Sequence, residues 1–158
     1  MRRSLAPTIL LAVLASAACS SLTYSNSRLD AMQTELSRRY ALWKGLHIPS
    51  YDYRFERACA CDSSLTRPVI VTVLDSAITG VAYADSGTAV PDSTLQTYLT
   101  VEGLFYQIQV AINLQVDSLG VEYDQVYNYP TRILIDQDFR QQGDELRLFS
   151  SLLTPKQP

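Results

Sequence analysis

The feature that most constrains the fold is a repeated order of segments, in which one helix-like pattern precedes three strand-like patterns. Apolar residues recur every three or four positions over residues 28–46, which predicts an amphipathic helix. Aromatic and charged residues then alternate strictly over 51–56, as in a half-buried strand. Runs of β-branched and small residues over 69–74 and 77–84 predict two more strands.

The same order returns in the second half of the chain. Ser93 and Gln96 are spaced as a capping box, which predicts a helix that starts near Pro91, and its apolar stripe continues until Gly120. Strands are predicted at 121–127, 132–136 and 145–153. We therefore expect an α+β fold in which tandem α-β-β-β units form one antiparallel sheet of about six strands, with two helices packed on one face.

The N-terminus has the composition of a cleavable export signal. Arg2 and Arg3 precede an apolar run over residues 5–14 that is too short to span a bilayer, and small residues follow it. Cys19 comes directly after those small residues. We therefore expect residues 1–18 to be a signal peptide and Cys19 to be the acylated first residue of a bacterial lipoprotein.

A second interpretation of the same segment stays open. Lipoprotein signals usually carry Leu, Val or Ile three residues before the cysteine, and this chain has Ser16 there. Ordinary signal-peptidase cleavage after Ala17 would instead leave a soluble secreted protein. Both interpretations place the protein outside the cytoplasm, either anchored to the cell envelope, at the outer membrane or the periplasmic face, or free.

Removal of the first 18 residues from the 158-residue chain leaves 140 residues, enough for one domain. Residues 19–27 are small or polar and predict a flexible tether, and residues 28–154 predict a single α+β domain. A tether of this length spans roughly 16 Å by random-coil scaling, so an acylated protein would lie against the membrane surface. Its partners would then be other envelope components.

The charge of the chain excludes some partners. The net charge is −3, and loss of Arg2 and Arg3 lowers it to −5, which makes nucleic acid an unfavourable partner. Residues 68–131 contain no Lys or Arg but seven acids: Asp75, Asp85, Asp92, Glu102, Asp117, Glu122 and Asp124. These acids either keep the protein soluble or form a negative face for a basic partner.

Several motifs resemble the family named domain of unknown function 6174, a group of predicted bacterial lipoproteins and secreted proteins. The motifs are Trp43, Ser50-Tyr51-Asp52-Tyr53, Cys59-Ala60-Cys61, Tyr123-Asp124, Tyr127-Asn128-Tyr129-Pro130, Ile133-Leu134-Ile135-Asp136 and Asp144-Glu145. The chain departs from that family at Asn128 and Ser76, where the family tends to have Gly. The resemblance implies a fold and an exported location, and it implies no reaction.

Cys59 and Cys61 are the strongest chemical candidates. In an oxidising compartment, paired cysteines tend to form disulfides. Residues two apart in a continuous strand lie about 6.5 Å apart, so we expect the strand to end near Ala58 and the pair to close a small ring. A redox-active pair, free thiols and a crosslink to another chain remain alternatives.

The sequence lacks the sets of residues that a metal site or a catalytic site requires. His47 is the sole histidine and lies at the opposite end of the first strand from the cysteines, so a zinc site is not expected. Calcium ligands can be drawn from Asp136, Asp138, Asp144 and Glu145, but their spacing matches no known loop. A two-carboxylate hydrolase would need Asp124 and Asp136 to approach each other. We predict no cofactor, no metal and no enzyme.

The expected function is therefore non-catalytic binding. Tyr127 and Tyr129 flank a turn before a proline, and tyrosine side chains at a surface suit protein or glycan recognition. We take Tyr123, Asp124, Tyr127, Tyr129 and Asp136 as candidate binding residues. The chain is predicted to be a lipid-anchored binding or structural module of the envelope. A secreted inhibitor or ligand-binding protein and a small redox or hydrolytic enzyme are the alternatives.

Overall fold

The computed structural model describes the backbone of residues 18–156 and the side chains of residues 28–156. One antiparallel sheet has the strand order β3-β2-β1-β6-β5-β4. The strands are β1 (Tyr51–Ala58), β2 (Val69–Leu74), β3 (Ala77–Tyr83), β4 (Ser118–Tyr123), β5 (Pro130–Asp136) and β6 (Leu146–Pro155). The long helices are α1 (Ala18–Gly45) and α2 (Val101–Asn113), and the short 3-10 helices are η1 (Ser63–Leu65) and η2 (Asp92–Thr97). The predicted α+β fold is confirmed.

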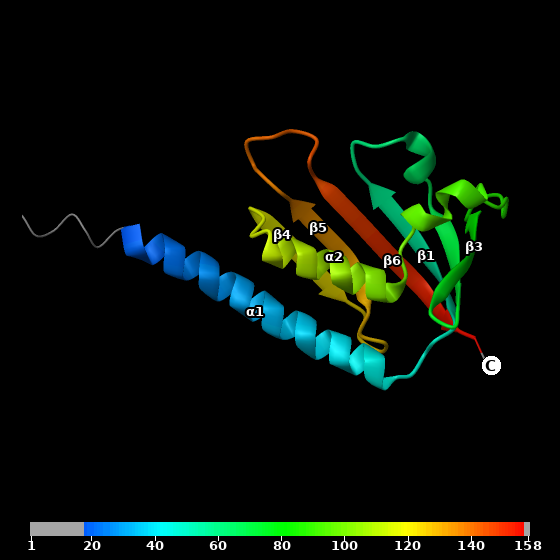
Figure 1. Ribbon diagram of the computed structural model, residues 1–158, viewed down its shortest axis with the longest axis horizontal. Coiled ribbons are helices and arrows are strands. Elements are labelled where there is room, and N and C mark those ends of the chain that lie inside the picture. The colour runs from blue at the N-terminus through cyan, green and yellow to red at the C-terminus, as the bar shows by residue number, and fades with distance from the viewer. Residues whose placement is uncertain (1–17, 157–158) are drawn as a thin grey trace, which may run out of the picture.

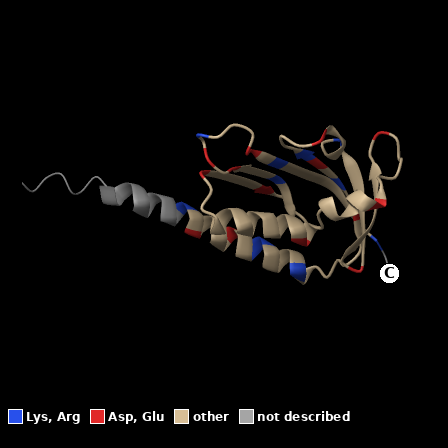
Figure 2. Ribbon diagram, turned by 45° about the horizontal axis from the view of Figure 1, so that its top comes forward, with Lys and Arg blue, Asp and Glu red and all other residues tan. Residues whose placement is uncertain are grey.

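The molecule has two layers. Both long helices lie on the same side of the sheet, and no other described element covers the opposite side (Figures 1 and 2). Helix α2 packs on β4 and β5, η2 contacts β3, and α1 lies alongside α2. The two halves join where β1 pairs with β6 at the centre of the sheet. Helix α1 therefore packs mainly on the other helix, rather than over the three strands that follow it.

Alternation along the strands builds the core. Three buried residues of β1 pair with three buried residues of β2: Tyr51 with Val73, Tyr53 with Val71 and Phe55 with Val69. Trp43, Tyr51, Tyr53, Phe55 and Tyr98 form a continuous row of edge-on or tilted rings, with centroids 5.6 to 6.3 Å apart. Each such contact contributes about 0.5–1.5 kcal/mol beyond area burial. The row connects the end of α1 to the segment before α2.

The second helix is shorter than predicted at both ends. Its N-terminal cap is Thr100, whose hydroxyl accepts a hydrogen bond from Gly103 N at 3.1 Å. The predicted capping box from Ser93 to Gln96 is wrong, because this segment forms the 3-10 helix η2, whose cap makes no side-chain hydrogen bond. Tyr98 is buried although its backbone is extended. The spacing between Tyr98 and the apolar residues of α2 therefore resembled the spacing of a longer helix. Gly120 lies in β4 opposite Leu134 rather than ending the helix.

Helix α1 begins at Ala18, so residues 19–27 are helical and not the tether that their composition predicted. Helix-breaking proline and glycine are absent from 19–27, so a helix nucleated from residue 28 onward can extend towards the N-terminus. The predicted signal peptide falls almost entirely on residues 1–17, outside the described residues. Within residues 18–156, no helix is both long and apolar enough to cross a bilayer.

Candidate functional site

The five predicted binding residues do not form one site. Tyr123, Asp124, Tyr127 and Tyr129 lie at the turn between β4 and β5, whereas Asp136 is the last residue of β5 and pairs with the first residue of β4. The turn and Asp136 are therefore at opposite ends of the same hairpin. Asp124 and Asp136 therefore do not approach each other, as a two-carboxylate hydrolase built on this pair would require.

Asp124 organises the turn. Its Oδ1 accepts hydrogen bonds from Val126 N at 2.8 Å and Tyr127 N at 2.6 Å, and its own backbone N donates to Tyr129 O at 2.9 Å. Asn128 has a φ of 63°, the left-handed conformation that Asn tolerates better than most residues. The carboxylate is thus occupied by the backbone, as expected of an Asp that precedes a turn.

All three tyrosines of the turn are packed inward, and Tyr127 is half-buried against the hydrophobic core. Tyr129 is 3% exposed, and its ring lies 6.5 Å from that of Trp43. Tyr123 is half-buried and stacks on Phe105 of α2 at 6.2 Å. Burial raises the pKa of the Tyr123 hydroxyl to about 12, and the nearby Glu35 carboxylate adds to this. These rings therefore fasten the hairpin to the helices.

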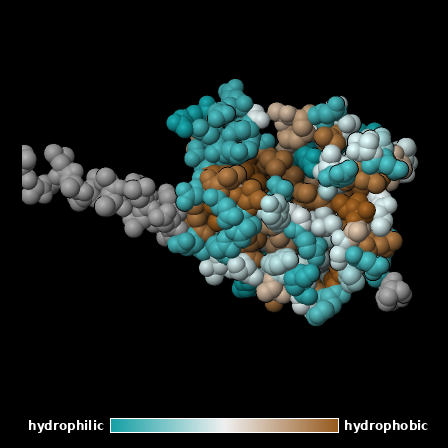
Figure 3. Space-filling view, viewed as in Figure 1, coloured by the Kyte–Doolittle hydropathy of each residue, from teal (hydrophilic) through white to brown (hydrophobic). Residues whose placement is uncertain are grey.

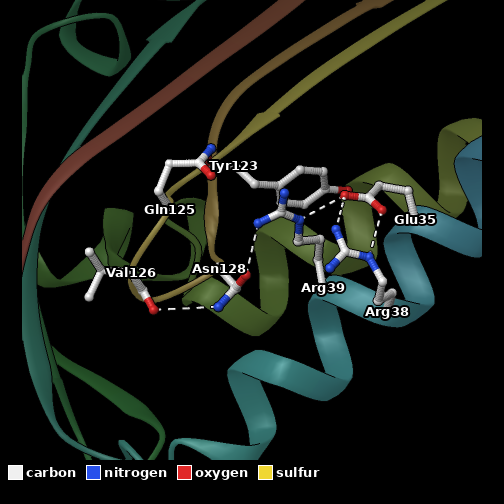
Figure 4. A network of polar contacts seen from close by, with 7 residues as sticks. All are labelled: Glu35, Arg38, Arg39, Tyr123, Gln125, Val126 and Asn128. Atoms are coloured by element: carbon white, nitrogen blue, oxygen red, sulfur yellow. Dashed lines mark hydrogen bonds and ion pairs between the residues drawn. The ribbon is translucent and has the colours of Figure 1, made fainter.

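A polar network fastens the same turn to α1 (Figure 4). Arg39 donates to Asn128 Oδ1 at 2.8 Å and to Glu35 Oε1 at 2.7 Å, and its guanidinium lies 5.2 Å from the centre of the Tyr123 ring. Hydrogen bonds from Arg38 and Arg39 lower the pKa of Glu35 to about 2. Sequence analysis did not single out Arg39, because its partner on the turn is 89 residues away in the chain.

Cys59 and Cys61 form a disulfide directly after the end of β1, as predicted, with Cα atoms 5.3 Å apart. A bridge that closes three residues contributes about 1.6 kcal/mol on the chain-entropy model, roughly half the value for a 15-residue loop. The bridge adjoins the loop between β5 and β6, since a Cβ placed on Gly143 would lie 3.6 Å from Ala60 Cβ. Its role in the fold is therefore local.

Asp136 lies in an acidic corner with Asp117, Asp138, Asp144 and Glu145. Desolvation and then the charges of Asp144 and Glu145 raise the pKa of Asp136. One carboxylate oxygen each of Asp136 and Asp144 is buried without a hydrogen-bond partner, while the other oxygen of Asp144 accepts from Asp138 N at 2.9 Å. In the described part of the chain, no group of acidic, His or Cys side chains has an arrangement that could hold a metal ion.

The seven acids of residues 68–131 do not gather on one face. Asp75 and Asp85 lie beyond opposite ends of β3, and Asp117 and Asp124 lie beyond opposite ends of β4. Others are paired with basic side chains: Arg132 lies 2.9 Å from Glu122. The arrangement gives no continuous negative surface for a basic partner.

The structure instead offers a groove between α1 and α2, which we call the α1–α2 groove. Its first hollow, of about 250 Å³, is lined by Leu36, Ser37 and Tyr40 of α1 and by Phe105, Tyr106 and Gln109 of α2. Its second hollow, of about 500 Å³, is lined by Trp43, Lys44, His47, Ile48, Pro49 and Ser76. On this side of the molecule, apolar residues gather across the middle and hydrophilic residues lie mainly around them (Figure 3).

Glu102 joins the two hollows, because it lines both. Its Oε1 accepts a hydrogen bond from Trp43 Nε1 at 3.1 Å and lies 3.6 Å from Lys44 Nζ, and its Oε2 accepts from the Tyr51 hydroxyl at 3.5 Å. The Glu102 side chain is 29% exposed. A carboxylate is thus held in a fixed position with part of its surface open to the groove.

The far end of the groove is built from two loops. His47 and Ser76 both have left-handed backbones, with φ of 51° and 68°, and both line the second hollow. Ser76 N donates to Pro49 O at 2.8 Å, and Asp75 N donates to Ser50 Oγ at 3.1 Å, so the β2–β3 turn is tied to the segment between α1 and β1. The conformation of Ser76 follows from the two-residue turn between β2 and β3, in which Asp75 also has a positive φ of 49°.

The sole histidine of the chain, His47, lines the second hollow of the groove. The only side-chain hydrogen bond of His47 among the described residues joins its Nδ1 to Gly45 O at 2.8 Å, so the imidazole is not paired with a nucleophile. The groove has no signal in the sequence, because its central contact, Trp43 with Glu102, joins residues 59 positions apart. No local spacing predicts such a contact.

The fold and the groove together define a two-layer α+β domain with an uncovered sheet face and a groove between its helices. The chain belongs to the family of unknown function DUF6174, whose model matches residues 35–155. That range includes the groove, the disulfide, the hairpin turn and the acidic corner. No curated protein and no solved structure matches the chain.

Proposed function

We propose that this protein is an exported, lipid-anchored module of the bacterial cell envelope that binds a ligand without transforming it. The observation that carries the proposal is the order at the N-terminus: two arginines, a short apolar run, small residues and then Cys19. Acylation of Cys19 after cleavage would leave the mature chain attached to the membrane by its first residue.

The position of the groove supports this proposal. Helix α1 begins at Ala18, next to the acylation site, and supplies one wall of the α1–α2 groove from Leu36 onward. Leu36 lies 17 positions after Cys19, which corresponds to a rise of about 26 Å along a helix. The groove would therefore be held no more than about that distance from the lipid surface, where envelope ligands are concentrated.

Metabolic labelling with palmitate tests the anchor. We expect the wild-type protein to incorporate label and to fractionate with membranes, and we expect Cys19→Ala to lose both properties. Ser20→Ala, which changes the next residue and keeps the thiol, serves as the matched control and should behave as wild type. An unlabelled, fully soluble wild-type protein would contradict the proposal.

A second candidate is a secreted, soluble ligand-binding protein or inhibitor. Ser16 favours it, because lipoprotein signals usually have a larger apolar residue three positions before the cysteine. Cleavage after Ala17 would leave Ala18 as the first residue, whereas lipoprotein processing leaves Cys19. N-terminal sequencing of the exported protein therefore distinguishes the two candidates, since an unblocked Ala18 start excludes the lipoprotein.

A further inference from the structure

We propose that the α1–α2 groove binds a neutral saccharide chain. This deepens the proposed function, on which it rests for placing the groove among envelope glycans. The groove combines a balanced pair of charges, hydrogen-bonding groups of both kinds and exposed aromatic rings, and these are the elements that a neutral, polyhydroxylated ligand requires.

The charges favour an uncharged ligand. Glu102 and Lys44 carry opposite charges 3.6 Å apart at the junction of the two hollows, so the centre of the groove has no net charge. An anionic ligand would meet the exposed part of the Glu102 carboxylate, and a cationic ligand would meet the Lys44 ammonium. A sugar hydroxyl can donate to the carboxylate and accept from the ammonium at the same time.

The aromatic side chains supply the apolar part of the site. Tyr40 is 39% exposed and Tyr106 is 65% exposed, and both line the first hollow above the buried Leu36 and Phe105. Each tyrosine offers a flat apolar ring with a hydroxyl at its tip, which matches a ligand that presents both C–H groups and hydroxyls. Rings of this kind bury a large area at a small cost in rotamer entropy.

The far end of the groove is preorganised. The hydrogen bonds from Ser76 N to Pro49 O and from Asp75 N to Ser50 Oγ fix the loops of the second hollow before a ligand arrives. Glu102 is likewise positioned by Trp43 and Tyr51. Preorganisation lowers the entropic cost of binding, which matters for a weakly bound ligand such as a short sugar chain.

A peptide strand would gain less from this groove. The walls of its first hollow are two α-helices, whose interior backbone groups are already hydrogen-bonded within each helix, so this part offers no strand edge to an extended peptide. A saccharide uses only side-chain contacts, and the groove provides these. A peptide is therefore the competing ligand that the experiment includes.

The single tryptophan of the chain makes the test direct, since Trp43 lines the second hollow and donates its indole N–H to Glu102. The purified processed protein, in detergent if acylated, is titrated with two neutral probes, a β-1,4-linked N-acetylglucosamine tetramer and maltotetraose. The readouts are Trp43 fluorescence and the indole N–H resonance. We expect a saturable shift with at least one probe at millimolar concentration or below.

Tyr106→Ala should weaken that binding by about tenfold, as truncation of an aromatic anchor does. Phe139→Ala is the matched control, because Phe139 is 68% exposed on the loop between β5 and β6 and does not line the groove; it should bind as wild type. Absence of a saturable shift with both sugars, a shift that Tyr106→Ala leaves unchanged, or a shift with an unrelated peptide alone would overturn the saccharide proposal.

The outcomes for ligand and anchor are separable. Palmitate labelling without sugar binding would refute the ligand class and leave the envelope module standing. Sugar binding by an unlabelled, secreted protein would refute the anchor and leave the groove standing.

Discussion

Among the predicted binding residues, Asp124 has a structural role that a single substitution tests. Replacement with Ala removes the acceptor for two backbone N–H groups, those of Val126 and Tyr127, at 2.8 and 2.6 Å. A hydrogen bond to a charged acceptor contributes about 1.5–3 kcal/mol when buried. Since Asp124 is half-buried and the Val126 N–H can turn to water, we expect Asp124→Ala to destabilise the domain by about 2 kcal/mol.

Urea unfolding followed by Trp43 fluorescence measures this loss. Trp43 is 2% exposed, and the ring of Tyr129, at the end of the same turn, is 6.5 Å from it, so the probe reports on both the core and the hairpin. With a slope of about 1.5 kcal/mol per molar urea, the midpoint should fall by about 1.3 M.

Asp124→Asn is the matched control, because its side-chain oxygen still accepts from the two N–H groups. We expect its midpoint to fall by less than half as much as that of Asp124→Ala. Equal midpoints for Asp124→Ala and wild type would refute the structural role, because they would show that the Asp124 carboxylate does not stabilise the turn. Equal losses in both variants would show that charge, rather than the acceptor oxygen, stabilises the turn.

Three further predictions concern stability. Thr100→Ala removes the acceptor of Gly103 N and should lower the free energy of unfolding by about 1 kcal/mol, while Thr100→Ser retains most of it, as urea unfolding would measure. Because the folded pKa of Asp136 is raised, wild-type stability falls as pH rises from the unfolded value through the folded pKa. Asp136→Asn should therefore be more stable than wild type at pH 7, with a difference that closes below about pH 4; a constant difference would contradict this. The double variant Cys59→Ser/Cys61→Ser should stay folded and lose no more than about 2 kcal/mol, and loss of the sheet signal in circular dichroism would contradict a local role.

The first three strands were predictable because their burial is local, whereas β4 runs over Ser118–Tyr123 rather than the predicted 121–127. Tyr51, Tyr53 and Phe55 alternate with Asp52 and other charged residues, and the structure buries those three and leaves the alternating residues on the uncovered face. The start of α2 was not predictable in the same way. Tyr98 has the spacing of a helix but is buried from an extended backbone, and the Thr100 cap decides where the helix begins.

The candidate site was less predictable than the fold. Tyr127 and Tyr129 flank a turn, which indicated exposure, but Tyr129 fills a space beside Trp43 that only the folded chain creates. The groove depends on contacts between α1 and α2, such as Trp43 with Glu102. Helix periodicity identifies which residues share a face, and it does not determine which second helix that face meets.

The intact mass of the processed protein tests the central claim, export followed by acylation at Cys19, most directly. The proposal predicts a chain that begins at Cys19, carries the added mass of its acyl groups and retains the Cys59–Cys61 bridge as two hydrogens fewer than the reduced form. A mass that corresponds to the unprocessed chain from Met1, recovered from the cytosol, would contradict it.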